Sequence, residues 1–196
     1  MKKMLKKILP IILYNLLKKA YSLIIPTQQP QGINPESLRK NSDIFVTLNF
    51  DENAIRAKLK RYGYNYEDKD LSWHYHIFTG WYEYCYSNNK EINNILEIGT
   101  HDGRFTNFLS KIYDSSKIFT IDLPQNDEFF INSYGREKLD ERNKFIETRS
   151  KNLDRSNIKF SELNSINIAN FFNDMKFDAI WVDGDHHNPQ VTLDIL

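Results

Sequence analysis

Short apolar runs alternate with helical stretches along the second half of the chain. Runs of strand length cover residues 95–98, 118–121, 158–160 and 177–182, and apolar residues at helical spacing cover residues 105–113 and 166–173. Strands that alternate with helices in this way form parallel βαβ units. The pattern therefore predicts an α/β fold built on a parallel sheet.

Two further helices are predicted before the first strand. Asp51 or Asn53 is a suitable N-cap for a helix over residues 54–61. Residues 71–86 form a second candidate helix, which carries aromatic side chains almost all round. We expect this aromatic helix to pack against the sheet.

Three residues in the aromatic helix carry reactive side chains. His74 and His76 lie two positions apart, so they point to different sides of a helix and cannot form an i, i+4 metal pair. We interpret both as histidines of an aromatic interface, and a role near substrate is the alternative. Cys85 is the single cysteine of the chain, which excludes an internal disulfide and fits a reducing, cytoplasmic setting.

The positive charge of the chain is concentrated at its beginning. Residues 1–40 carry eight Lys and Arg against one acid, so the remaining residues sum to −7 because the net charge is zero. Residues 1–25 read as a basic amphipathic helix, and residues 26–69 as a linker with a helical extension. The uncharged run at residues 8–17 is about half of the ~20 residues that cross a bilayer, so the arm is expected neither to span nor to be exported.

Two interpretations of this arm remain open. It docks on its own domain or on a second subunit of a homo-oligomer, or it lies in the membrane interface at the inner face of the membrane. Nucleic acid is disfavoured as a partner, because the remaining body of the protein is acidic and would repel phosphate.

Residues 95–103 carry the most informative motif. A strand that contains Glu97 passes through Gly99 and Gly103 into a helix, and the next strand ends at Asp122, nineteen residues after Gly103. Acids at the carboxyl ends of parallel strands lie where such sheets bind ligands, and an acid at about this spacing takes ribose hydroxyls. Glu97 disfavours a dinucleotide, because a carboxylate beside this turn would oppose a pyrophosphate. S-adenosylmethionine (SAM) carries an ammonium group and no phosphate, so it fits the acid better.

Three stretches, residues 96–103, 121–123 and 177–186, resemble class I SAM-dependent methyltransferases. The first motif is similar to small-molecule O-methyltransferases of the catechol and caffeoyl-CoA types, and residues 182–186 (Val-Asp-Gly-Asp-His) resemble a bacterial group that includes sugar and antibiotic tailoring enzymes. The resemblance covers residues 70–196 and implies a Rossmann-like SAM-binding domain. It implies the following binding residues: Glu97, Gly99, Thr100 and Gly103 for the methionyl end, Asp122 for the ribose, and Asn164 and Ser165 for the adenine edge.

Residues 183–187 are the predicted catalytic cluster. Asp183 ends the fourth strand, and in the catechol and caffeoyl-CoA types the matching aspartate binds a divalent metal, which implies Mg²⁺ here. Two alternatives remain open: His186 or His187 is a general base, or Asp183 only orders its loop or meets the amino group of SAM.

The chain ends inside the helix expected after the fourth strand, at residues 191–196. The resemblance implies three more strands, so we expect a fragment whose sheet is truncated after the fourth strand, or a partner that supplies the remainder. The insert at residues 123–157 is predicted to hold a charged helix at residues 137–151. This helix is either a solvated surface helix or a lid whose arginines (Arg136, Arg142, Arg149 and Arg155) face an anionic acceptor.

The leading functional hypothesis is O-methylation of a small hydroxylated acceptor, such as a sugar of a bacterial glycan. The alternative is a non-catalytic, membrane-associated or assembly protein that retains the SAM-binding fold.

Overall fold

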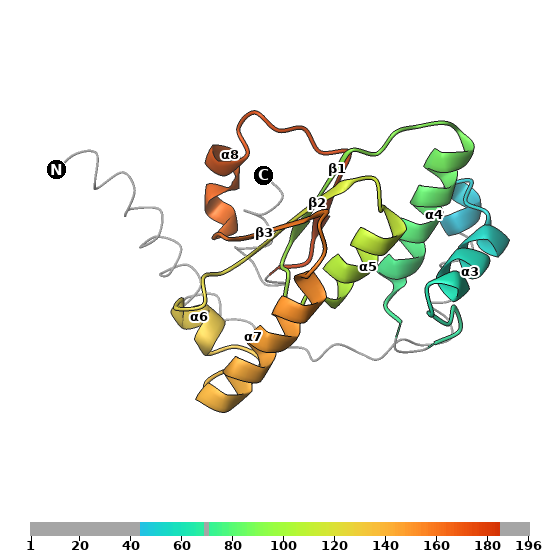
Figure 1. Ribbon diagram of the computed structural model, residues 1–196. Coiled ribbons are helices and arrows are strands. Elements are labelled where there is room, and N and C mark those ends of the chain that lie inside the picture. Colours follow the sequence, from blue (N-terminus) through green and yellow to red (C-terminus); the bar gives the residue numbers. More distant parts are fainter. Residues whose placement is uncertain (1–43, 69–70, 185–196) are drawn as a thin grey trace, which may run out of the picture.

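A computed structural model of the protein describes residues 44–68 and 71–184 (Figure 1). Its strands are β1 (Asn94–Ile98), β2 (Lys117–Asp122), β3 (Ile158–Glu162) and β4 (Ala179–Val182). Its helices are α3 (Glu52–Arg61), α4 (Trp73–Ser87), α5 (Arg104–Ile112), α6 (Glu128–Ile131), α7 (Leu139–Leu153), the 3₁₀ helix η1 (Ser165–Asn167) and α8 (Ile168–Phe171).

The four strands form one parallel sheet in the order β3-β2-β1-β4. Each strand is joined to the next by a segment that contains at least one helix, as parallel pairing requires. The predicted α/β fold with a Rossmann-like parallel sheet is therefore confirmed.

Alternation of side chains along the strands divides the core into two parts. Ile95 and Ile118 face a layer that contains α3, α4 and α5, where apolar and aromatic side chains form the larger cluster. Leu96 and Ile121 face the other side, where Phe172 and the segment around α8 cover the sheet. Helices thus lie on both faces of the sheet, and α8 lies opposite α4 and α5 (Figure 1).

Local sequence explains the first two helices. The Asp51 side chain accepts hydrogen bonds from the backbone N–H groups of Asn53 and Ala54, so Asp51 is the N-cap of α3. The aromatic helix α4 packs Tyr75 and Phe78 against Phe105 of α5, with ring centroids 5.0 and 5.5 Å apart. The two helices predicted before the first strand are therefore present.

The predicted bounds were less accurate in two places. The helix expected at residues 166–173 is a turn of 3₁₀ helix followed by one turn of α-helix, since Asn164 caps the first turn and Phe172 ends the second. The last strand begins at Ala179 rather than at residue 177, because Phe177 packs beside Phe119 and Phe172 on the α8 face.

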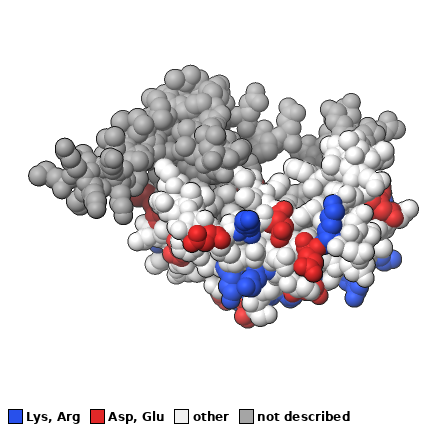
Figure 2. Space-filling view, turned by 90° about the horizontal axis from the view of Figure 1, so that it is seen from above, with Lys and Arg blue, Asp and Glu red and all other residues white. Residues whose placement is uncertain are grey.

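Several expectations lie outside the described residues. These are the amphipathic arm at residues 1–25, the beginning of the linker, and the candidates His186 and His187. Within residues 44–68 and 71–184, every helix is too short or too polar to cross a lipid bilayer. On the face shown in Figure 2, acidic and basic side chains of the described residues are interspersed rather than gathered by sign.

Candidate functional site

The carboxyl ends of all four strands meet at one edge of the sheet. There the chain continues into Gly99 after β1, ends β2 at Asp122, reaches Asn164 after β3, and reaches Asp183 after β4. The structure therefore brings the predicted binding and catalytic positions of the described residues to one edge, as expected for ligand sites of parallel sheets.

Glu97 lies under α5 rather than open to solvent at the edge. Its register partner on β2 is Thr120, and both residues share the face that α5 covers. Oε2 of Glu97 accepts hydrogen bonds from the hydroxyls of Thr106 on α5 (2.5 Å) and Thr120 (2.6 Å). The hydroxyl of Thr100 lies 2.6 Å from that of Thr120 and extends this buried chain.

The environment of Glu97 favours its protonated form. Glu97 is 1% exposed. Desolvation raises its pKa to about 8, although the hydrogen bonds from the two threonines act in the opposite direction. Near neutral pH a cation at this end of the site would therefore displace a proton from Glu97.

The turn after β1 lies in close contact with the loop after β4 and with α7. Gly99 has φ of 103°, and a Cβ on it would lie 2.2 Å from the backbone oxygen of Asp183. Gly103 has φ of 75°, and a Cβ there would lie 3.1 to 3.3 Å from side-chain atoms of Asn152 and Leu153 on α7. Glycine is required at Gly99 because the loop after β4 crosses directly over it.

Asp122 is held by groups from three segments. Its Oδ1 accepts the N–H of Leu123 at 2.8 Å, and its Oδ2 accepts the N–H of His101 at 3.1 Å. His101 has a positive φ of 49°, an uncommon conformation for a residue with a side chain, and in this turn its N–H donates to Asp122. Arg149 of α7 lies 3.4 Å from Oδ2.

Arg149 is the buried cation of this edge. It is 2% exposed, and its guanidinium carbon lies 4.8 Å from the ring centre of Phe160. Its Nη1 donates to Asp122, and its Nη2 lies 3.9 Å from Oε1 of Glu162 at the end of β3. Burial raises the pKa of Asp122, whereas the N–H of Leu123 and the charge of Arg149 oppose this rise. Arg149 thus favours the carboxylate form of Asp122.

Removal of Arg149 is expected to change the titration of Asp122. Arg149→Met keeps much of the side-chain volume, so the pKa of Asp122 should rise, and the protein should lose about 1–3 kcal/mol of unfolding free energy. The loss should be larger at pH 7.5 than at pH 4.5, because without Arg149 the buried Asp122 binds a proton more readily as the pH falls. Carboxyl ¹³C NMR and urea unfolding at both pH values measure the two effects.

Lys151→Met is the matched control, because Lys151 is an exposed cation on the same helix and pairs with the exposed acid Glu147. It should leave the pKa of Asp122 unchanged. An equal rise in both variants would show that Arg149 does not act on Asp122 directly.

Asn164 and Ser165 lie at the end of the third strand as predicted, and part of their polar capacity is used locally. Oδ1 of Asn164 accepts the N–H of Ile166 at 3.1 Å and so caps η1. Ser165 is the first residue of that helix. Both side chains are half-buried at the site edge, and a role at the adenine stays a prediction.

A family model described as a methyltransferase domain matches residues 96–196, slightly more than half of the chain. This chain belongs to that methyltransferase family. The matched region begins inside β1 and includes Glu97, the glycine turn, Asp122 and Asp183. A comparison with curated proteins found no match.

Solved structures show only remote similarity to this methyltransferase. A putative caffeoyl-CoA O-methyltransferase from Staphylococcus aureus is 18% identical with a TM-score of 0.43, and the alignment covers 81% of this chain and 66% of that one. A SAH-bound methyltransferase from Podospora anserina is 16% identical with a TM-score of 0.36, and the alignment covers 81% of this chain and 61% of that one. A fibrillarin/Nop5p complex is 17% identical with a TM-score of 0.34, with 46% of this chain and 36% of that one covered. The chain thus spans less than two thirds of the length of each.

The metal predicted at Asp183 is not supported by the arrangement of ligands. Asp183 follows β4, and its N–H donates to the carbonyl oxygen of Ile98 at 2.8 Å. Within the part of this methyltransferase that the structure describes, no three His, Cys, Asp or Glu side chains are grouped so that they could hold a metal ion. We therefore derive no step through Mg²⁺.

Four residues of this methyltransferase edge were not predicted as site residues from the sequence. Thr106 and Thr120 hold Glu97, the backbone of His101 holds Asp122, and Arg149 was counted only among the arginines of the insert. Strand alternation could have identified Thr120, because it falls on the same face as Glu97 once the register is known. Nothing local in the sequence identifies Arg149, which comes from α7, 27 positions after Asp122.

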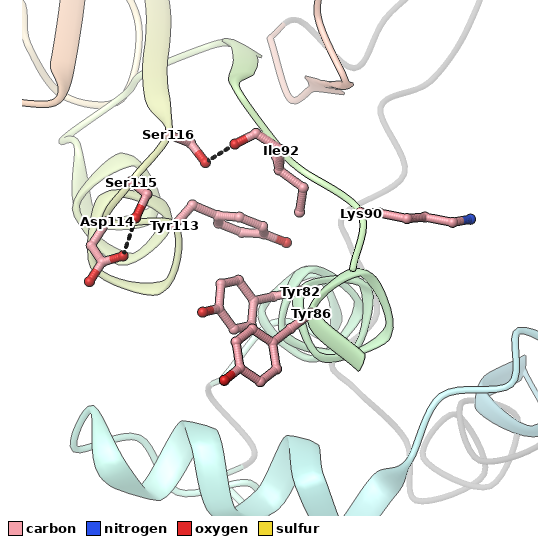
Figure 3. A pocket seen from close by; sticks show the side chains of 8 residues that line it. All are labelled: Tyr82, Tyr86, Lys90, Ile92, Tyr113, Asp114, Ser115 and Ser116. Atoms are coloured by element: carbon pink, nitrogen blue, oxygen red, sulfur yellow. Dashed lines mark hydrogen bonds between the residues drawn. The ribbon is translucent and has the colours of Figure 1, made fainter. Parts of the chain in front are cut away.

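A small hollow of about 120 Å³ lies at the other end of the methyltransferase sheet (Figure 3). It is lined by Ile92, before β1, by Ser116, before β2, and by the tyrosines Tyr82, Tyr86 and Tyr113. The Ser116 hydroxyl donates to the Ile92 carbonyl at 2.6 Å. Because this hollow is at the amino ends of the strands, it does not belong to the carboxyl-edge site.

Proposed function

We propose that this methyltransferase binds SAM along the carboxyl edge of its sheet and transfers the methyl group to a small hydroxylated acceptor. In this proposal Asp122 accepts the ribose hydroxyls. Glu97 and the turn from Gly99 through Thr100 to Gly103 hold the methionyl end, and Asn164 and Ser165 meet the adenine edge.

The observation that carries the proposal is the arrangement around Asp122. Two backbone N–H groups and Arg149 fix its carboxylate beside the turn after β1. A fixed carboxylate at this edge is an acceptor for the paired hydroxyls of a ribose. Rigid placement also reduces the cost of ordering the site when a ligand binds.

The turn supports SAM over a dinucleotide. Asp102 in the turn accepts hydrogen bonds from the N–H and Nε of Arg104, at 3.2 and 2.7 Å. Although burial acts in the other direction, the hydrogen bonds from His101 and Arg104 lower the pKa of Asp102 to about 2. The sulfonium and ammonium groups of SAM would therefore meet an ionised acid at this turn, which favours a cationic ligand.

The proposed reaction is a direct methyl transfer. The acceptor oxygen forms a bond to the methyl carbon as the carbon–sulfur bond breaks, which releases S-adenosylhomocysteine (SAH), and the hydroxyl proton passes to a base. Asp183 lies at the end of β4 against Gly99, and His186 and His187 follow it in sequence. These three remain the candidate catalytic residues. The choice of an oxygen acceptor rests on the resemblance of the motif at residues 96–103 to O-methyltransferases, and the choice of a bacterial sugar on the resemblance of residues 182–186.

Asp122→Ala is expected to weaken SAH binding by about 1–3 kcal/mol, the scale of hydrogen bonds to a charged group. Isothermal titration of the full chain with SAH measures this effect. Asp114→Ala, which removes an exposed acid at the opposite end of the sheet, should leave the affinity unchanged.

Two outcomes would reject this function. A heat signal from NADH and none from SAH would assign the site to a dinucleotide, and equal SAH affinity in both variants would remove Asp122 from the site. SAH binding without transfer to any acceptor would instead favour a non-catalytic assembly protein.

A further inference from the structure

A groove of about 450 Å³ lies between the turn after β1 and the insert. Asp102 lines it from the turn, and Tyr134, Arg136, Lys144 and Phe145 line it from the insert. The groove is distinct from the Asp122 carboxylate, which is not among its lining residues. It shares the turn with the proposed cofactor site, however, so a ligand in the groove would lie beside that site.

Arg136 is held in this groove by aromatic rings. Its guanidinium carbon lies 4.0 Å from the ring centre of Phe130 and 4.7 Å from that of Phe145. Its Nε donates to the carbonyl oxygen of Ser133 at 3.1 Å. The residue is 5% exposed, so these contacts fix its position.

The two terminal nitrogens of Arg136 lack an acceptor among residues 44–68 and 71–184, because Nε makes the one hydrogen bond of this guanidinium. Neither nitrogen is among the fully buried polar atoms that lack a partner, so a ligand in the groove can reach them. Arg149 differs, because it is paired with Asp122 at 3.4 Å. The free N–H groups of Arg136 can donate two parallel hydrogen bonds to a planar or tetrahedral oxyanion.

The acids that line the groove are already matched by cations. Asp102 pairs with Arg104 at 2.7 Å, and Glu141 lies 3.5 Å from Lys144. Arg136 is therefore the cation of the groove that forms no ion pair within residues 44–68 and 71–184. Burial lowers the pKa of Arg136, whereas the charge of Asp122 raises it. Arg136 therefore interacts electrostatically with the acid that is proposed to hold the ribose.

We propose that this groove binds an anionic group, a carboxylate or a phosphate, that the methyl acceptor carries, with Arg136 as its bidentate donor. The assignment to the acceptor rests on the proposed methyl transfer, because SAM itself offers no phosphate. The insert would thus select charged acceptors. Phe130 and Phe145 would hold the guanidinium in the orientation that points its N–H groups toward the anion.

The test uses the full chain and measures binding of inorganic phosphate by titration calorimetry at low ionic strength. Arg136→Gln should weaken phosphate binding about tenfold or more, on the scale of a charged hydrogen bond. Lys138→Gln is the matched control, because it removes one exposed cation two positions away and should change the affinity less than about twofold. Arg136→Lys keeps the charge but removes the planar pair of N–H donors, so it should weaken phosphate binding by an intermediate factor.

A second measurement avoids any variant that fails to fold. In the wild-type chain, phosphate should shift the amide ¹H–¹⁵N resonances of Gly135 and Thr148, which line the groove, and leave that of Ser115, in the hollow of Figure 3, unchanged. Shifts at Ser115 alone, or equal losses in Arg136→Gln and Lys138→Gln, would overturn the groove as the anion site.

Glucose 1-phosphate and glucose distinguish an acceptor anion from free phosphate. In the presence of SAH, the sugar phosphate should bind at least tenfold more tightly than glucose and lose this advantage in Arg136→Gln. Binding of inorganic phosphate without any preference for the sugar phosphate would overturn the assignment to the acceptor. SAH affinity should fall less in Arg136→Gln than in Asp122→Ala, because Arg136 acts on Asp122 only through its charge. Failure of SAH binding in every chain would reject the methyltransferase proposal separately.

Discussion

Gly99→Ala is expected to lower the free energy of unfolding by about 3 kcal/mol or more, because the new Cβ would lie 2.2 Å from a backbone oxygen. That oxygen belongs to Asp183, whose N–H is bonded to Ile98, so neither side of the contact can move without opening β1 from β4. Urea unfolding measures the loss. We also expect SAH binding to be abolished, since the turn would be displaced.

Gly63→Ala and Gly135→Ala are matched controls for this substitution. Both glycines have positive φ, 84° and 74°, but nothing lies within 4 Å of a Cβ built on either. Each substitution should lower the free energy of unfolding by only about 1 kcal/mol, because it introduces only the strain of the left-handed conformation. If Gly99→Ala cost no more than these two, the crossing of the chain over Gly99 would not be tight.

Glu97→Gln is expected to reverse its effect on stability between pH 5 and pH 8. Glu97 titrates near 4.5 in the unfolded chain and near 8 in the folded one, so the folded state holds the extra proton between these values. Wild-type stability should therefore fall as the pH rises through this window and level off above it. The variant lacks this group, so its stability relative to wild type should increase by about 3–5 kcal/mol from pH 5 to pH 8.

Urea unfolding at half-unit pH intervals tests this prediction. Glu91→Gln, at an exposed acid just before β1, should show no such pH-dependent difference. A pH profile for Glu97→Gln parallel to that of the wild type would mean that Glu97 is ionised when buried. SAH affinity should rise with pH toward 8 in the wild type, because an ammonium then no longer has to displace a proton, and this rise should vanish in the variant.

Most of the sheet could be predicted from the sequence because its strands are short apolar runs that alternate with helices. Asp51 was one of the two caps predicted for α3, and the structure selects it over Asn53. The segment after β3 was not predicted correctly, because its eight residues were treated as one helix. Asn164 instead starts a 3₁₀ turn, and the packing of Phe172 against Phe119 ends the following turn early.

The site was predictable only as far as single segments determine it. Glu97 and Asp122 could be placed at strand ends from their position in the motif. The burial of Glu97 beneath α5 depends on the pairing of β1 with β2, which no local pattern provides. The buried positions of Arg136 and Arg149 depend on how the insert folds back over the strand ends. The sequence alone therefore left both a solvated helix and a lid open, with the solvated helix favoured.

The attachment of α7 to the strand ends makes the insert and the site one cooperative unit. Arg149 of α7 pairs with Asp122 at the end of β2. The side chain of Asn152, also of α7, donates to the carbonyl oxygen of Asp102 in the glycine turn at 2.8 Å, so one helix contacts both parts of the site. Any fluctuation that lifts α7 breaks both contacts at once, and amide hydrogen exchange in α7 and in the turn should therefore occur through the same opening event. A ligand that fastens the turn will slow exchange across the whole insert without touching most of it.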